Sequence, residues 1–207
     1  MKSKIYNVIS ICITLVFFGC STSKSFESQI NVHRNQFKNS FLENPRSPLE
    51  ENDLKYLSFF TPDKNWKKSA TFTKEDNAVP FEMPTYSGIT KPYIIFGYLD
   101  FDVDNKKIRL QVYQSAQKPP NPLYKNHLFL PFKDTTNGES TYGGGRYLDL
   151  KTDDIKNDKV VLDFNQCYNP WCAYSEGFNC PVPPSANHLN FEVNAGEKMY
   201  TGPVKKK

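Results

Sequence analysis

Three cysteines stand close together in the stretch CYNPWCAYSEGFNC, namely Cys167, Cys172 and Cys180, and thiols can do three kinds of chemistry. With His188 they could form a Cys3His zinc site, although their spacing lacks the C-x2-C pair of most structural zinc sites. One of them could be a nucleophile with His188 as its base, but no neighbouring residue marks a thiol as activated. In an oxidising compartment, two of them would form a disulfide. The compartment therefore decides which chemistry to expect.

If a disulfide forms, two pairings come first. Cys172 and Cys180 flank a segment in which Glu176-Gly177 can turn the chain back. Closing that loop would contribute about 2.5 kcal/mol in the chain-entropy model. The pair Cys167 and Cys172 is expected to be more strained, because it encloses a proline.

The stretch TYGGGRYLDL offers a possible anion site at residues 141–150. The glycines Gly143, Gly144 and Gly145 give the backbone access to positive φ, and successive N–H groups in such a turn can form an anion nest. Arg146 adds a fork of donors that suits a carboxylate ligand. The same residues are also typical of a tight turn that enters a strand. A turn is therefore expected here, either with or without a binding site.

Other side chains suggest further chemistry. Asp149 and Asp163 could form a carboxylate pair with Tyr142 or Tyr168 as partner, since glycoside hydrolysis needs two carboxylates about 5–10 Å apart. Tyr168, Trp171 and Tyr174 could supply flat stacking surfaces for a sugar.

Several known motifs are missing or incomplete. The aspartates of LDFDVDNKKIRLQVY fail the calcium-loop pattern, because its sixth and twelfth positions hold Asn105 and Gln111, and a hairpin turn at Asp104-Asn105 is favoured. No G-x-S-x-G, H-E-x-x-H or Walker-type motif occurs. Neither a metal nor a cofactor is therefore expected.

The first residues predict export. Lys2 and Lys4 precede an apolar run at 8–18, which is too short for a transmembrane helix but suits a secretory signal. Gly19-Cys20 after such a run is the pattern of a lipoprotein signal, although Phe17 replaces the usual leucine. We expect residues 1–19 to be removed, Cys20 to be lipidated and the protein to be anchored to a membrane through that lipid.

The destination follows from charge. Ser21–Ser25 lacks an acidic run, so the periplasmic face of the outer membrane is the expected location. The formal charge of +4 falls further once the two signal lysines are removed, which argues against nucleic acid as a partner.

The remaining chain suits one domain over residues 26–204, after a tether at 20–25. Phe26, Ile30, His33, Phe37 and Phe41 recur at helical spacing, with Ser25 as the cap and Pro45 as the stop. A second short helix is expected from Ser47, with Glu50 closing a capping box.

The body of the domain, residues 69–200, predicts a mainly β fold of the α+β class. Short strands follow one another without helices between them, which favours an antiparallel sandwich or partly open barrel. The seven expected strands are 70–73, 79–83, 93–101, 108–114, 127–132, 146–150 and 159–164.

The stretches LFLPFKDTTNGESTYGGGRYLDL, VLDFNQCYNPWCAYSEGFNCPVPP and NHLNFEVNAGEKMY resemble an uncharacterised bacterial family, domain of unknown function 1684. The resemblance covers about residues 28–200. It implies that Cys172 pairs with Cys180 and that Cys167 is spare, because the family usually has a small residue there. It implies no activity. It also singles out polar residues, namely Asp134, Tyr142, Arg146, Asp149, Asp163, Asn165, Tyr168, Asn169, Asn187 and Glu197.

Three functions remain open at this point. The favoured one is an envelope lipoprotein that binds a sugar, peptide or carboxylate ligand in a pocket uniting residues 142–147 with 163–174. The alternatives are a structural or partner-contact lipoprotein, which a sealed Arg146 paired with Asp149 or Asp163 would favour, and an envelope hydrolase. The expected ligand-binding residues are Tyr142, Gly143, Gly144, Gly145, Arg146, Asp149, Asp163, Asn165, Tyr168, Asn169 and Tyr174.

Overall fold

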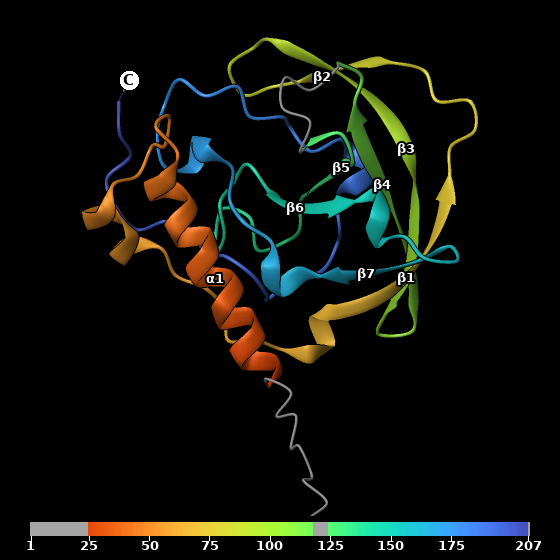
Figure 1. Cartoon of the computed structure of the whole chain (residues 1–207), viewed down its shortest axis with the longest axis horizontal. Helices are drawn as coiled ribbons and strands as arrows, with labels where there is room; N and C mark the ends of the chain where they lie inside the picture. Colours follow the sequence, from red (N-terminus) through yellow and green to blue (C-terminus); the bar gives the residue numbers. More distant parts are fainter. Residues whose placement is uncertain (1–24, 118–123, 207) are drawn as a thin grey trace, which may run out of the picture.

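The computed structural model describes residues 25–117 and 124–206 (Figure 1). The predicted signal, Cys20 and nearly all of the predicted tether lie outside the described residues. Among the helices that are described, none has both the length and the apolar character needed to cross a bilayer.

Seven antiparallel strands form one sheet that curls into a half-barrel (Figure 1). The order of the strands is β6-β5-β4-β3-β1-β7, and β2 pairs with β3 beside this path. Their bounds are β1 Lys67–Lys74, β2 Phe81–Pro84, β3 Thr90–Val103, β4 Lys106–Ser115, β5 His127–Phe132, β6 Arg146–Lys151 and β7 Lys159–Asp163. Each expected strand is present, so the predicted mainly β fold is confirmed.

Alternation along the strands divides the side chains between two faces. In β5, Leu128, Leu130 and Phe132 join the main core on the inner face of the curl. Phe129 points to the opposite face, where it packs with Tyr147 and with residues of β2 and β4. We call this second group, which comprises Met83, Tyr113, Phe129 and Tyr147, the outer-face cluster.

The β3–β4 hairpin confirms the turn predicted at Asp104-Asn105. Both residues have positive φ, at 48° and 62°, as a two-residue type I′ turn requires. Val103 and Lys106 pair directly across this turn. The alternating aspartates therefore belong to a hairpin.

The first helix, α1, spans Phe26–Glu43 and is capped by the Ser25 side chain, as predicted. Ile30 and Phe41 are buried, and Phe41 meets Tyr174 edge to face at 5.5 Å. The helix thus packs against the irregular segment that follows β7, at one side of the half-barrel (Figure 1).

The second helix was predicted wrongly. It starts at Glu51 rather than after Ser47, and it is a short 3-10 helix, η1, over Glu51–Tyr56. The Ser47 hydroxyl accepts from the N–H of Leu49, but Glu50 is still extended, with φ −107° and ψ 173°, so the helix begins only after it. The capping box forms three residues later, between Glu50 and Asp53.

Pro131 lies inside the sheet and has no N–H to donate, and a side chain from a distant loop supplies hydrogen bonds at this position. Strand β5 pairs with β4 at Tyr113↔Phe129, which brings Gln111 opposite Pro131. The Asn187 amide accepts from the Gln111 N–H and donates to the carbonyls of Gln111 and Pro131, each at 2.8 Å. One buried amide therefore replaces the ladder bonds that the proline cannot make.

Candidate functional site

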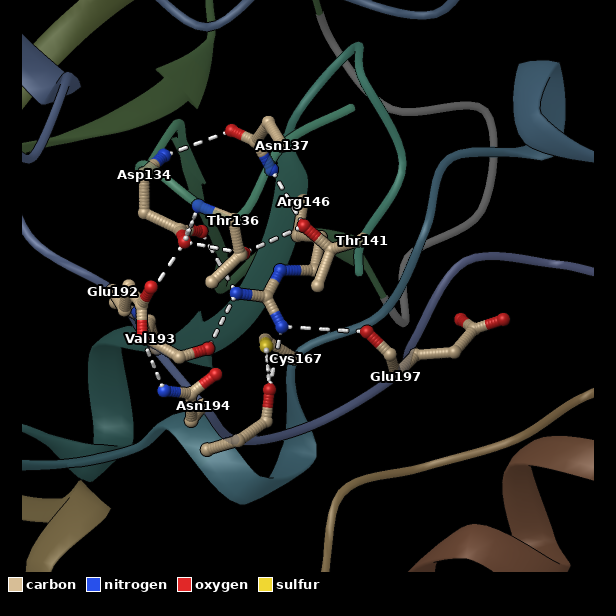
Figure 2. Close-up of polar contacts among 11 residues, drawn as sticks. Asp134, Thr136, Asn137, Thr141, Arg146, Cys167, Glu192, Val193, Asn194 and Glu197 are labelled. Carbon is tan, nitrogen blue, oxygen red and sulfur yellow. Dashed lines mark hydrogen bonds and ion pairs between the residues drawn. The ribbon is translucent and has the colours of Figure 1, made fainter. Parts of the chain in front are cut away.

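Arg146 enters the structure from the first position of β6 and is fully buried. Its guanidinium forms an ion pair with Asp134 at 2.8 Å (Figure 2). It also donates to the backbone carbonyls of Val193, Ala195 and Glu197, at 2.8, 2.5 and 3.3 Å. Asp134, rather than Asp149 or Asp163, is thus the partner of this arginine, and the pair is sealed from solvent.

Asp134 is held as firmly as its partner. Its carboxylate accepts from the N–H groups of Thr136 and Val193 as well as from Arg146. Because both charged groups have several partners, the pair fixes residues 193–197 against the strands. We call Asp134, Arg146 and the carbonyls of residues 193–197 the arginine hub.

The glycine run beside the arginine hub allows a tight turn of the backbone. Gly145 has φ +88°, and its N–H donates a hydrogen bond to the carbonyl of Tyr142. A Cβ on Gly145 would lie 2.6 Å from the carbonyl oxygen of Phe132, and one on Gly144 would lie 2.3 Å from the Tyr142 ring. The turn interpretation therefore accounts for Gly144 and Gly145 without a ligand.

Several other expected ligand residues hold loops together. Asn165 exchanges two hydrogen bonds with the backbone of Asp63, both at 2.8 Å, and Asp163 caps the Asn165 N–H. Asn169 donates from its side chain to the carbonyl of Lys198. Asp163, Asn165 and Asn169 are all buried, and their hydrogen bonds to backbone groups support the loops around them.

Glu197 is a buried acid with unusual proton affinity. Its carboxylate accepts from the Tyr174 hydroxyl and from the Asn169 N–H, each at 2.8 Å. Burial raises the pKa of Glu197 to about 7, although these hydrogen bonds act in the opposite direction. Figure 2 shows this carboxylate pointing away from the guanidinium of Arg146.

Glu197 gives a prediction about stability and pH. The pKa of Glu197 is about 7 in the folded state, above the ordinary glutamate value of 4.5, so the folded protein binds an extra proton between these pH values. The contribution of this proton to the free energy of unfolding is fully present below about pH 4.5. It is lost as the pH rises through 7, and the free energy of unfolding falls by about 3 kcal/mol. Glu197→Gln should therefore gain stability relative to wild type as the pH rises from about 5 to 8. Urea unfolding at several pH values measures this difference.

The matched control is Glu176→Gln, which changes an exposed acid in the same region. Its stability relative to wild type should stay constant over that range. If Glu197→Gln behaved in the same way, the buried carboxyl would have an ordinary pKa in the folded protein.

The cysteines follow the pairing that the resemblance implied. Cys172 and Cys180 form a disulfide with a Cα–Cα distance of 6.2 Å, which excludes the Cys3His zinc alternative. Cys167 is free and buried, and burial raises its pKa to about 11, so it is no thiolate nucleophile. Within 25–117 and 124–206, no group of three or more His, Cys, Asp or Glu residues is arranged to hold a metal.

One predicted site residue does face solvent among possible partners. The Asp149 side chain is 46% exposed, and its oxygens contact His127 Nε2 and the Tyr168 hydroxyl, both at 2.8 Å. His127 and Tyr168 come from β5 and from the segment after β7, and the backbones of Tyr168 and Tyr147 pair directly. We call Asp149, His127 and Tyr168 the Asp149 surface.

Aromatic rings surround the Asp149 surface. Tyr124, which is 60% exposed, meets the His127 ring at 6.1 Å, and Tyr93 stacks on Phe129 at 5.7 Å. Burial and then the Asp149 charge raise the pKa of Tyr93 to about 12, so its hydroxyl keeps its proton. The arrangement offers a carboxylate, an imidazole and phenol groups on one face of the sheet. Sequence reasoning named no partner for His127, because its contact with Asp149 depends on the β5–β6 register.

Residues 142–147 and 163–174 were expected to line a pocket together, and the contact between them includes a pair of backbone hydrogen bonds. The two stretches do come together, through mutual hydrogen bonds between the backbones of Tyr147 and Tyr168. Two hollows in the described part of the chain lie elsewhere, one around Trp66 and Phe191 and one beside His127. Asp149 and Asp163 share none of their hydrogen-bond partners, so the contacts give no support to a carboxylate pair.

Comparisons with known proteins agree with the motifs. Residues 52–198 match the family described as "Protein of unknown function (DUF1684)". A similar solved structure is the solution NMR structure of an uncharacterized protein from gene locus rrnAC0354 of Haloarcula marismortui. The sequences are 34% identical, the TM-score is 0.67, and the match covers 86% of this chain and 96% of that one. No curated protein matches the chain. The match over most of its length shows that the chain belongs to the DUF1684 family of proteins of unknown function.

Proposed function

We propose that this protein is an exported, lipid-anchored binding or accessory protein of the bacterial cell envelope. The observation that carries the location is the Cys172–Cys180 disulfide, combined with the Gly19-Cys20 pattern after a short apolar run. Disulfides persist in oxidising compartments such as the periplasm, which is where a lipoprotein signal would deliver the chain. The periplasmic face of the outer membrane is the proposed site of anchoring.

Lipid attachment is tested by replacing Cys20. In bacterial cells fed a labelled palmitate analogue, the wild-type protein should take up label and sediment with membranes. Cys20→Ser should take up none, because the sulfur that carries the lipid is gone. Gel fluorescence of the purified chains is the measurement. Cys12→Ser, which alters a cysteine inside the signal, is the matched control and should be labelled like wild type. An unlabelled wild-type chain would contradict the anchor.

The binding role is assigned to the Asp149 surface rather than to the glycine run. Its carboxylate is exposed, and its bonded partners among the described residues are a tyrosine hydroxyl and an imidazole. A group that donates hydrogen bonds, such as a sugar hydroxyl or a peptide amine, can reach it without first breaking an ion pair with lysine or arginine. Neighbouring aromatic rings supply apolar contact, which is the usual composition of a ligand site.

The binding role makes a second prediction. Envelope sugars or muropeptides that bind here should raise the melting temperature of wild type, since a ligand specific for the folded state stabilises it. Asp149→Asn should lose most of this rise, because the amide removes one acceptor and the charge. A thermal-shift screen measures the effect. Asp102→Asn, a change at an exposed acid in the β3–β4 hairpin, should respond like wild type.

The structural alternative has its own support. Arg146 is sealed in an ion pair, and the buried asparagines bind backbone groups, as expected of residues that support long loops. If no compound stabilises wild type in the screen, contact with a protein partner at the membrane becomes the favoured function.

A further inference from the structure

A second aromatic cleft lies away from the Asp149 surface, at the end of the molecule where β1 begins. It has a volume of about 370 Å³, within the range of roughly 300–1,000 Å³ typical of small-molecule sites. Trp66 and Phe191 lie nearly parallel in it, with 16° between their ring planes and 6.5 Å between centroids. Both rings are half-buried, so part of each remains accessible.

Polar groups surround these rings on several sides. Asn65, Lys68, Asp104, Glu192 and Asn194 line the cleft, and Val103 completes it. They come from the short 3-10 helix Lys64–Trp66 and the start of β1, from the β3–β4 turn and from the segment after β7, so only the folded chain brings them together. The Lys68 ammonium lies 5.9 Å from the centre of the Trp66 ring, and Asn194 Nδ2 donates to Glu192 Oε2 at 2.8 Å.

We propose that this cleft binds a saccharide ring. The apolar C–H face of a sugar fits against a flat indole, while amides and carboxylates pair with neighbouring hydroxyls. The alternatives fit less well. One lysine beside two carboxylates gives no excess of positive charge for a phosphate-rich polymer, and five polar residues of the eight that line the cleft are too many for a purely apolar ligand.

The position of the cleft allows two sources of the sugar. The Lys67 ammonium lies 5.8 Å from the centre of the Phe26 ring, so the start of β1, whose neighbouring residues line the cleft, lies near the start of α1 (Figure 1). The sugar can therefore be a soluble glycan or the headgroup of a glycolipid in the anchoring membrane. The binding chemistry is the same for both.

Trp66 itself provides the readout. The chain has two tryptophans, so Trp171→Phe leaves Trp66 as the only tryptophan whose emission is followed. Titrating this variant with chitotetraose or maltotetraose should produce a saturable change in emission if the source is soluble. Vesicles of phosphatidylcholine that contain a galactosyl diacylglycerol should produce it, and plain vesicles should not, if the source is a glycolipid.

Substitutions at two exposed residues allow an effect on binding to be measured without an effect on folding. Glu192→Ala and Asn194→Ala, each in the Trp171→Phe background, should weaken binding about fivefold to tenfold, as loss of a hydrogen bond predicts. Their melting temperatures should stay near that of the parent. Asp76→Ala makes the same charge change as Glu192→Ala at an exposed turn outside the cleft and should bind normally.

The proposal is overturned if neither soluble glycans nor glycolipid vesicles change Trp66 emission. It is equally overturned if the Glu192 and Asn194 variants bind as tightly as the parent. The two proposals can fail separately, because the Asp149 surface is judged by the part of the thermal shift that Asp149→Asn removes and the cleft by the emission of Trp66.

Discussion

Arg146→Met is expected to lower the free energy of unfolding by about 3–5 kcal/mol, the cost of removing one partner from a buried ion pair. Methionine keeps an unbranched apolar stem but lacks the guanidinium, so the change removes all of the donors. It leaves the buried Asp134 carboxylate without its cation, and it leaves the carbonyls of Val193 and Ala195 without their donor. Urea denaturation, followed by far-UV circular dichroism, measures the loss.

Three further variants make this result specific. Arg109→Met removes the arginine of an exposed pair with Asp100 and should cost less than about 1 kcal/mol. Adding Asp134→Asn to Arg146→Met should recover part of the loss, because the unpaired charge is removed. If the methionine variant does not fold, Arg146→Lys keeps the charge with fewer donors and should be measurably destabilised. A fully stable Arg146→Met would contradict the structural role of the hub.

Asn187→Ala is expected to cost about 2–4 kcal/mol, since it leaves three buried backbone groups unpaired. Those groups are the N–H and carbonyl of Gln111 and the carbonyl of Pro131, at the place where β4 and β5 meet. Asn187 is fully buried, so water cannot readily take over its bonds. The same denaturation experiment measures the loss, and hydrogen exchange at the Gln111 amide should accelerate.

The control for Asn187 is the nearby Asn190, which is exposed. Asn190→Ala should change stability by less than about 0.5 kcal/mol, as is usual for surface positions. Asn187→Asp adds a second comparison, because it keeps the acceptor for the Gln111 N–H but loses both donors. If the alanine and aspartate variants were as stable as wild type, the β4–β5 junction would not depend on this amide.

These two residues show what the polar positions singled out by the family resemblance do here. Arg146, Asn165, Asn169 and Asn187 all bind backbone groups of segments far away in the sequence. Asp149 is the exception, since its side chain reaches solvent. A residue type that can bind a ligand can also satisfy buried backbone groups, and sequence alone does not distinguish the two.

The sequence by itself determined the local structure. Short runs rich in Phe, Tyr, Ile and Val, separated by turn-forming residues, located all seven strands, Ser25 and Pro45 marked the ends of α1, and Asp104-Asn105 marked a hairpin turn. These signals are readable because each arises from residues only a few positions apart. The start of the second helix was missed by a few residues, since Glu50 is extended and the helix begins only after it.

Tertiary structure alone decided which side chains meet. That Arg146 pairs with Asp134, that Asn187 fills the gap at Pro131, and that His127 contacts Asp149 depends on sheet register and on how the segment after β7 returns across the strands. The Trp66 cleft has the same origin, because Phe191 reaches it only after the sheet has curled. Which polar groups pair over long sequence distances depends on all the buried polar groups of the folded protein together. Local sequence patterns therefore do not predict these pairings.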